Sequence, residues 1–221
     1  MTYQLDDIAS IQDHYFEKDL DFGVDLPRDK KRNNAQGGDR FRPSQYGIMY
    51  GKYLPRWVGK KPVYVEIGIL CGTGMAVLND YFINADMYGF DCYLDNYYDN
   101  QNRLKLRGAF KNSKPQVYPY DSYEDNKKMI NYLFSDKKIN IIVDDADHKV
   151  ESMLIHLETF VPYIDTKNFL YIIEDTGRYK DTKSLSEQLK DKFIECYTGQ
   201  KDADIRFEFH KSYMVFSSYS R

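Results

Sequence analysis

Short apolar runs alternate with amphipathic helical patterns along most of this chain. A short apolar run between turn residues predicts a buried strand, whereas apolar positions that recur every three or four residues predict a helix. The predicted strands cover residues 63–67, 87–90, 116–118, 139–143 and 169–173. Predicted helices lie at residues 74–82, 122–134, 150–161 and 185–197, and a capping box at Ser122 opens the second of them. The last two apolar runs, 205–209 and 213–216, are separated by too few residues for a parallel crossover, so they predict an antiparallel pair.

This alternation of strands and helices predicts the fold class. We expect an α/β fold: a doubly wound, Rossmann-like, mostly parallel sheet of seven strands with a C-terminal antiparallel hairpin. The main domain is expected to span residues 44–221, and Ser44 is placed to cap its first helix, over residues 44–57. Residues 1–43 are expected to form an N-terminal helix followed by a lid or substrate loop, because glycine, proline and a charge run collect in their second half.

Composition and charge narrow the class of protein. The 221 residues include 31 Lys and Arg against 34 Asp and Glu, and this net charge of −3 argues against a nucleic-acid partner. No apolar run is long enough to span a membrane, and the first residues lack a signal-peptide pattern. The cysteines Cys71, Cys92 and Cys196 are widely spaced and odd in number, which argues against a disulfide framework and against a thiolate zinc site. We therefore expect a soluble, intracellular, cytoplasmic protein.

Acidic residues stand at the ends of five successive predicted strands. They are Glu66, Asp91, Asp121, the pair Asp144–Asp145 and the pair Glu174–Asp175. Because the carboxyl ends of parallel strands meet at one edge of a sheet, these side chains are expected to gather where α/β proteins bind ligands. Neighbouring carboxylates repel one another unless cations or hydrogen-bond donors compensate. The array therefore indicates a ligand rich in hydroxyl and amino groups, a metal ion, or both.

A glycine cluster follows the first predicted strand. Gly68, Gly72 and Gly74 have the spacing GxxxGxG, and Glu66 precedes Gly68 by two residues. This spacing differs from the GxGxxG of dinucleotide-binding proteins. It resembles the glycine loop of S-adenosylmethionine-dependent methyltransferases.

The resemblance to methyltransferases implies a cofactor site. The glycine loop would pass beneath the methionine and ribose of S-adenosylmethionine, Asp91 would bind the ribose hydroxyls, and Asp121 with Ser122 would border the adenine. The implied cofactor-binding residues are Glu66, Gly68, Gly72, Gly74, Asp91, Asp121, Ser122 and Asp144.

A second pattern follows the predicted strands at 139–143 and 169–173. The first strand leads into Asp144–Asp145, Ala146, Asp147 and His148, and the second leads into Glu174–Asp175. Over residues 44–216 the chain resembles the metal-dependent sugar O-methyltransferases, which are related to macrolide-sugar and rhamnosyl methyltransferases and to the cephalosporin-hydroxylase-like family. The sequence departs from that pattern at Ala146 and Asp147, where the family has Gly-Ser.

This second resemblance implies a metal site and an acceptor. Asp145, Glu174 and Asp175 would bind a divalent metal ion, and His148 would act as general base. The acceptor would be the hydroxyl of a sugar-containing small molecule or of a glycan.

The chemistry of methyl transfer explains these residue types. The donor methyl group is already activated, so the protein must position an acceptor oxygen and remove its proton. A sugar hydroxyl is a poor acid, and a hard divalent ion bound to two neighbouring oxygens lowers this barrier. Three carboxylates suit Mg²⁺, with Mn²⁺ or Ca²⁺ as alternatives. Histidine is a common general base near neutral pH, so His148 and the adjacent Asp145 are the expected catalytic residues.

Other interpretations stay open. A methyltransferase for a catechol-like diol uses similar chelation, although Asp-Asn would be usual where Glu174–Asp175 stands. An NAD-dependent oxidoreductase could use the same sheet, but the glycine spacing counts against it. A non-catalytic binding module would have no need to keep the acids and His148. Assembly into a homo-oligomer is also left open.

The remaining polar residues have structural interpretations. Asp147 is expected to cap the helix that begins near Lys149 rather than to join the site. Three further histidines have no acidic strand end beside them and are expected to be surface or packing residues; they are His14, His156 and His210.

Overall fold

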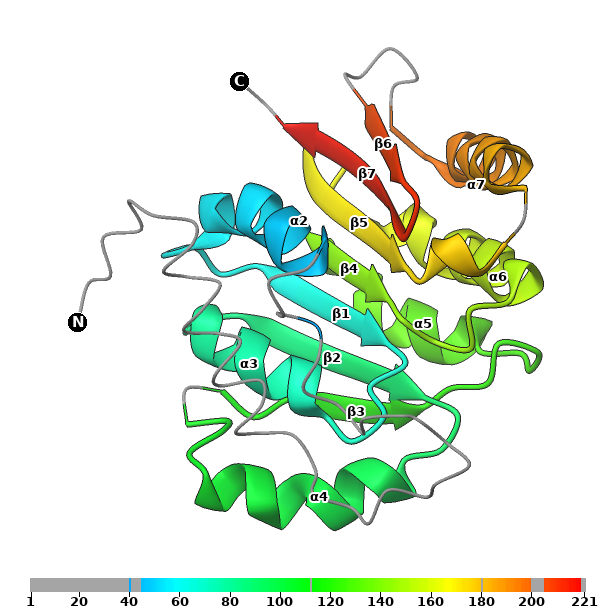
Figure 1. The fold of residues 1–221 in the computed structure, drawn as a ribbon. Coiled ribbons are helices and arrows are strands. Elements are labelled where there is room, and N and C mark those ends of the chain that lie inside the picture. Colours follow the sequence, from blue (N-terminus) through cyan, green and yellow to red (C-terminus); the bar gives the residue numbers. More distant parts are fainter. Residues whose placement is uncertain (1–39, 41–44, 112, 180, 200–204, 220–221) are drawn as a thin grey trace. The chain divides into compact units, whose positions relative to one another are not determined.

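The computed structural model describes Arg40 and residues 45–111, 113–179, 181–199 and 205–219 (Figure 1). Apart from Arg40, the predicted N-terminal segment 1–43 lies outside the described residues, as do the predicted cap Ser44 and, with that segment, His14. Within the described part, the chain forms two compact units. The first contains its residues up to Lys61, Ile69–Met87 and Tyr93–Gln116, and the second contains Pro62–Gly68, Tyr88–Cys92 and its residues from Val117 onward.

The second unit is built on the sheet, although β2 and β3 begin in the last residues of first-unit segments. The strands are β1 (Val63–Ile67), β2 (Asp86–Asp91), β3 (Gln116–Pro119), β4 (Ile141–Asp144), β5 (Asn168–Glu174), β6 (Arg206–His210) and β7 (Tyr213–Tyr219). They form one seven-stranded sheet in the order β3-β2-β1-β4-β5-β7-β6. β1, β4 and β5 pair in parallel, whereas β7 pairs antiparallel with both β5 and β6. The predicted sheet and its terminal hairpin are confirmed.

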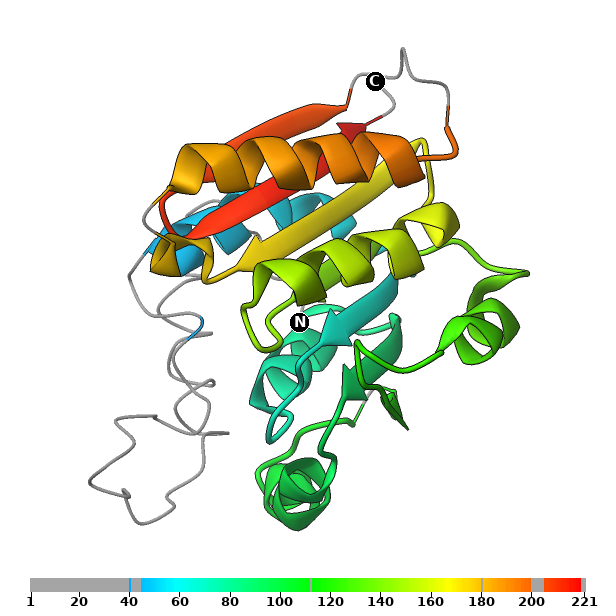
Figure 2. The same ribbon diagram turned by 90° about the vertical axis from the view of Figure 1, so that its right-hand side faces the viewer.

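Three helices pack on one face of this sheet (Figure 2). They are α5 (Lys127–Phe134), α6 (Val150–Phe160), which runs into the short helix η2 (Val161–Tyr163), and α7 (Thr182–Cys196). Alternate residues of a strand point to the same face, and the residues that meet the helices are apolar, among them Val65, Ile67, Ile142, Tyr171 and Ile173. Phe193 of α7 stacks on Phe216 of β7, with ring centroids 4.3 Å apart and an interplanar angle of 9°. Burying a ring of this size contributes about 1.5–3 kcal/mol, so this layer holds the strand ends in place.

The short helix η3 (Thr176–Arg178) follows β5 in the second unit, and the first unit carries the remaining described helices. They are α2 (Gln45–Tyr53), the short helix η1 (Pro55–Trp57), α3 (Thr73–Tyr81) and α4 (Asp95–Leu106). Gly72 lies directly before α3 with a φ of +80°, and a Cβ added there would lie 2.5 Å from the Tyr97 ring. The Asn100 amide donates a hydrogen bond of 3.0 Å to the Cys71 carbonyl. The glycine loop is therefore held against α4 by both a close contact and a hydrogen bond.

Three details differ from the sequence expectations. The capping box is wrong, because α5 begins only at Lys127 after Asn126, and Ser122 binds a histidine instead. The first helix ends at Tyr53, and Trp57 lies in the separate helix η1. Helix α4 was not foreseen, because it is mostly polar and buries only Tyr97, Asn100 and Leu104.

No helix in the described ranges is both long enough and apolar enough to cross a membrane.

Candidate functional site

The carboxyl ends of β1, β4 and β5 lie level with one another. In the parallel register Ile67 is opposite Asp144, and Asp144 is opposite Ile173. Chain order reverses between β1 and β4, which is the point where open α/β sheets bind ligands. The residues that follow these strands are therefore candidates for the site.

Gly68 allows the turn after β1 to contact the backbone that follows β4. The Asp145 amide donates a 2.8 Å hydrogen bond to the Ile67 carbonyl, and the Gly68 amide donates one of 2.7 Å to the Phe90 carbonyl. Gly68 has a φ of +86°, and a Cβ there would lie 2.2 Å from the Asp145 carbonyl oxygen. Only glycine satisfies both the backbone angle and the contact. The turn after β1 thus rests on the backbone that carries Asp145.

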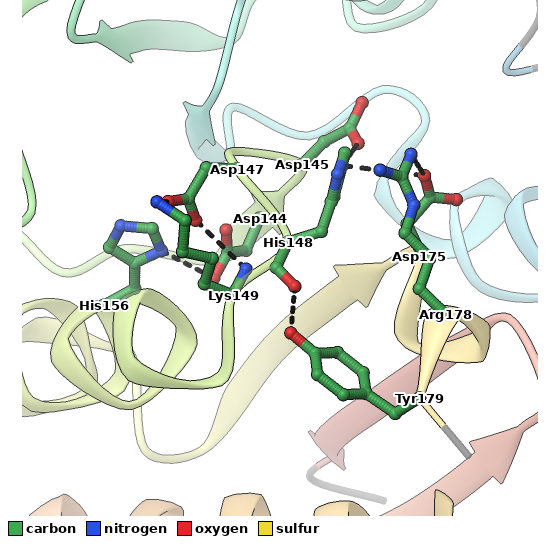
Figure 3. A network of polar contacts seen from close by, with 9 residues as sticks. All are labelled: Asp144, Asp145, Asp147, His148, Lys149, His156, Asp175, Arg178 and Tyr179. Atoms are coloured by element: carbon green, nitrogen blue, oxygen red, sulfur yellow. Dashed lines mark hydrogen bonds and ion pairs between the residues drawn. The ribbon is translucent and has the colours of Figure 1, made fainter.

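Asp145, His148 and Asp175 converge just beyond the ends of β4 and β5 (Figure 3). The His148 Nε2 lies 3.0 Å from Oδ1 of Asp145 and 3.6 Å from Oδ2 of Asp175. One ligand atom from each of the three residues falls within 4.8 Å of the others, and all three side chains are half-buried. Two carboxylates and an imidazole at this spacing can share one cation. The structure therefore brings together two of the three predicted metal carboxylates and the predicted base.

Two residues of this group adopt strained backbone angles. His148 has a φ of 60° and Asp175 a φ of 58°, in the left-handed region that residues other than glycine rarely adopt. The Tyr179 hydroxyl donates a hydrogen bond to the His148 carbonyl and so helps to hold this conformation. Such strain costs about 1–3 kcal/mol per residue and is concentrated at functional sites. The sequence held no signal for the contribution of Tyr179.

Arg178 gives the cluster a positive charge. Its guanidinium lies 2.5 Å from Oδ2 of Asp175, the oxygen that also faces His148. The Arg178 side chain is 62% exposed, so solvent screens this pair and it adds little to stability. Asp175 therefore faces both the Arg178 guanidinium and the His148 imidazole.

Asp147 does not take part in the cluster. It accepts hydrogen bonds from the Lys149 amide, at 3.1 Å, and lies 2.9 Å from the Lys149 ammonium. Partial burial raises the pKa of Asp147, but hydrogen bonds from Lys149 and Ser152 outweigh that effect and hold the pKa below its usual value. The carboxylate therefore closes the turn before α6. The expectation that Asp147 is the N-cap of α6 is wrong, because Lys149 occupies the N-cap position.

Asp144 points to the helical face of the sheet, because strand alternation puts it on the same side as Ile142. Its Oδ2 lies 2.8 Å from Nδ1 of His156, and the Nε2 of the same ring lies 2.7 Å from the Ser122 hydroxyl. Asp144 and His156 are both buried. A cofactor contact through the Asp144 side chain stays a prediction.

Of the two roles expected for His156, surface or packing, the structure shows the packing one, because the side chain is fully buried; its hydrogen-bond partners Asp144 and Ser122 were not foreseen. Its spacing from Met153, three residues before it on the apolar face of α6, was the signal that could have shown it to be buried. His210, by contrast, packs on Tyr213 with ring centroids 4.7 Å apart, as expected.

The other predicted site residues lie as follows. Glu66 is buried and accepts a 2.7 Å hydrogen bond from the Tyr64 hydroxyl, and Glu174 is buried at the end of β5. Gly72 and Gly74 belong to the first unit, at the start of α3. The roles of these residues stay predictions.

Asp91 and Asp121 flank the thiol of Cys92. The Tyr120 amide donates a 2.9 Å hydrogen bond to the Asp91 carbonyl, which joins the ends of β2 and β3, and Asp121 accepts one of 2.9 Å from the Tyr123 amide. Partial burial and the negative charges of Asp91 and Asp121 raise the pKa of Cys92. The two predicted cofactor acids are therefore neighbours.

Alkylation of Cys92 is expected to report on this pair of acids. A raised thiol pKa means little thiolate at pH 8, so iodoacetamide labelling of Cys92, read by peptide mass spectrometry, should be slow and should accelerate as pH rises through that pKa. Asp91→Asn removes one negative charge and should lower the pKa, which speeds labelling at pH 8 by about two- to fivefold. Asp125→Asn, a matched exposed acid, should leave the rate unchanged. Equal rates in wild type and Asp91→Asn would contradict the observed proximity.

Comparison with solved structures identifies the fold. The chain resembles the MycE methyltransferase from the mycinamycin biosynthetic pathway, in a structure with Mg, SAH and mycinamycin VI, with a TM-score of 0.57 and 16% identity over 79% of this chain and 50% of that one. A second MycE structure, with Mg and SAH, gives a TM-score of 0.53 and 16% identity over 96% of this chain and 49% of that one. A Klebsiella pneumoniae protein with an O-methyltransferase assignment gives a TM-score of 0.53 and 14% identity over 95% and 90% of the two chains.

These likenesses decide the fold class. The chain has the fold of the class I O-methyltransferases. It spans about half the length of the MycE chains it matches. No protein-family model and no curated protein sequence matches it.

Proposed function

We propose that this protein is an S-adenosylmethionine-dependent, divalent-metal-assisted O-methyltransferase that acts on a sugar hydroxyl. The observation that carries the proposal is the convergence of Asp145, His148 and Asp175 at the ends of β4 and β5. This cluster adjoins the Gly68 turn at the point where strand order reverses. The likeness of the fold to methyltransferases supports S-adenosylmethionine as the methyl donor, and the cluster of acids and His148 supports a bound metal ion.

The side chains present fit a hard divalent ion. Asp145 and Asp175 offer carboxylate oxygens within 4.8 Å of each other and of the His148 imidazole. Together with Glu174, the last residue of β5, they would hold Mg²⁺, or else Mn²⁺ or Ca²⁺. When bound, the ion would make a coordinated hydroxyl more acidic and fix its geometry.

The strand ends also fit the methyl donor. The Gly68 turn has no room for a Cβ, which is typical of backbone that passes close beneath a ligand. Asp91 ends β2 and Asp121 follows β3, and both lie close enough to Cys92 for their charges to raise its pKa. We assign Asp91 to the ribose and Asp121 with Ser122 to the adenine. Glu66, Gly72, Gly74 and Asp144 complete the proposed cofactor set.

His148 is the proposed general base. Its Nε2–H would donate to the Asp145 carboxylate 3.0 Å away, so the other ring nitrogen, Nδ1, would take the proton of the acceptor hydroxyl, and the carboxylate would stabilise the imidazolium that results. The hydrogen bond from Tyr179 to the His148 carbonyl fixes the backbone from which the ring projects. The residues of this chain thus position the acceptor and receive its proton.

The sugar acceptor rests on the likeness to MycE and on the pattern of acids. That protein was solved with Mg, SAH and mycinamycin VI. A sugar-containing small molecule or a glycan, a cytoplasmic location and the absence of a nucleic-acid partner belong to this proposal. Asp147, which departs from the family pattern, pairs with Lys149, so we do not assign it to the proposed metal site.

A thermal-shift panel tests the proposal. S-adenosylhomocysteine at a hundred times its Kd should stabilise the full chain by about 2.7 kcal/mol, which raises Tm by several degrees. Mg²⁺ or Mn²⁺ should add a further shift, and NAD⁺ should give none. Transfer of a labelled methyl group to sugar glycosides but not to catechols would then fix the acceptor class. Stabilisation by NAD⁺ and not by S-adenosylhomocysteine would overturn the proposal in favour of an oxidoreductase.

A further inference from the structure

The turn that follows β3, residues 121–126, is tied to the rest of the second unit by a buried chain of polar contacts. The Ser122 hydroxyl lies 2.7 Å from Nε2 of His156, and Nδ1 of that ring lies 2.8 Å from the Asp144 carboxylate. His156 is 0% exposed and Asp144 is 3% exposed. A buried carboxylate and imidazole of this kind are stable only when each is hydrogen-bonded.

The order of the three groups resembles that of a serine hydrolase, but burial assigns them another role. A general base must reach the substrate it deprotonates, and the His156 ring has no exposed surface. The imidazole has one nitrogen for each neighbour, so it can bridge Asp144 and Ser122 and do nothing more. The arrangement is suited to holding two segments at a fixed separation.

The two segments held in this way are both parts of the proposed site. On one side is the turn with Asp121 and Ser122, and on the other is Asp144, directly before the metal residue Asp145. A second contact of the same turn, from the Tyr123 hydroxyl to the Ser152 hydroxyl at 3.2 Å, also reaches helix α6. Helix α6 begins just after His148, so one helix supports both the turn and the metal-site loop.

We propose that His156 is a positioning residue that fixes the turn 121–126 against Asp144 and thereby sets the affinity for the adenosyl part of the methyl donor. This inference rests on the proposed function, because it assigns the adenine edge to this turn. It predicts that the Ser122–His156 hydrogen bond contributes to cofactor affinity although the His156 ring, which is 0% exposed, does not touch the cofactor.

Two substitutions cut the same hydrogen bond from opposite ends. Ser122→Ala removes the hydroxyl, and His156→Asn keeps a donor near the Nδ1 position for Asp144 but cannot reach Ser122. Calorimetry with S-adenosylhomocysteine should show Kd raised about fivefold in each variant, as expected for loss of one hydrogen bond. The double variant should be no weaker than either single one, because the bond is already broken. In turnover assays KM for the donor should rise while kcat stays near its wild-type value.

Tyr197→Phe is the matched control. It removes another hydrogen bond of the second unit, from the Tyr197 hydroxyl to the Thr166 carbonyl at 2.8 Å, away from the strand ends. It should lower Tm by an amount similar to Ser122→Ala and leave cofactor affinity unchanged. Mn²⁺ affinity should be unchanged in all of these variants.

The outcomes separate this inference from the proposed function. If the wild-type chain does not bind S-adenosylhomocysteine, the proposed function fails and the inference fails with it. If the wild type binds but Ser122→Ala and His156→Asn bind equally well, only the positioning role is overturned. If Ser122→Ala alone weakens binding, Ser122 acts by direct contact and the role of His156 is wrong. Ser122→Ala is a mild change at a half-buried residue of a mostly exposed turn, so the test does not depend on the folding of the His156 variant.

Discussion

Gly68→Ala is expected to destabilise the chain by about 2–4 kcal/mol and to abolish binding of S-adenosylhomocysteine. The new Cβ would lie 2.2 Å from the Asp145 carbonyl oxygen and 2.6 Å from Cα of Ala146, both of them backbone atoms. A residue with a Cβ at a φ of +86° costs about 1 kcal/mol, and overpacking against backbone costs about 1–3 kcal/mol more. The chain can relieve the clash only by moving the turn after β1 or the backbone of Asp145, and either shift opens the proposed site.

Gly108→Ala is the matched control for this prediction. Gly108 has nearly the same backbone angle, with a φ of +89°, but among the described residues a Cβ there would meet only the end of the flexible Lys111 side chain. Chemical denaturation should therefore show only the backbone cost of about 1 kcal/mol in Gly108→Ala, with cofactor binding intact. If both variants lose the same free energy of unfolding, the cost at Gly68 comes from its backbone angle alone, and the close contact with Asp145 adds nothing.

His148→Ala is expected to lower kcat by about 10²- to 10⁴-fold while leaving the affinity for S-adenosylhomocysteine near that of the wild type. A base that is positioned on the acceptor hydroxyl contributes to the rate and not to donor binding. Lys149→Ala provides a neighbouring control, because Lys149 is exposed and pairs with Asp147 outside the cluster. Its kcat should lie within about twofold of the wild type.

The same variant distinguishes a base from a metal ligand. If His148 binds the ion, the Mn²⁺ affinity of His148→Ala should fall together with kcat, and excess Mn²⁺ should restore turnover. If His148 is the base, excess metal should restore nothing. A kcat unchanged from the wild type would remove His148 from the reaction altogether.

The sheet could be predicted from the sequence because its signals are local. The strand at 63–67 is an uninterrupted apolar segment except for Glu66, and the terminal hairpin follows from the short link between its two apolar runs. Helix α4 escaped detection because only Tyr97, Asn100 and Leu104 of its residues are buried, and one of these three is polar. Where burial does not select apolar residues, periodicity carries no signal.

The sequence predicted which strand ends carry the site, but not how each side chain is oriented there. That Asp145 and Asp175 would meet follows from the parallel pairing of β4 with β5. Asp144 turns toward His156, whereas its neighbour Asp145 reaches the cluster. The face of the sheet to which each side chain points is fixed by the register of β4 against its neighbouring strands. The left-handed backbone of His148 and the hydrogen bond from Tyr179 depend on tertiary structure, so no local sequence pattern predicts them.

Titration of Mn²⁺ into the full chain, followed by electron paramagnetic resonance of the free ion, tests the central claim that the ends of β4 and β5 form one divalent-metal site. The wild type should bind one ion, and Asp145→Asn and Asp175→Asn should each weaken binding by at least about thirtyfold, because charge and ligand number set affinity at such sites. Glu174→Gln should weaken it comparably if the third carboxylate is a ligand. Asp147→Asn, two residues from Asp145 but paired with Lys149, should bind within about threefold of the wild type. Equal Mn²⁺ affinity in the wild type, Asp145→Asn and Asp175→Asn would contradict the account.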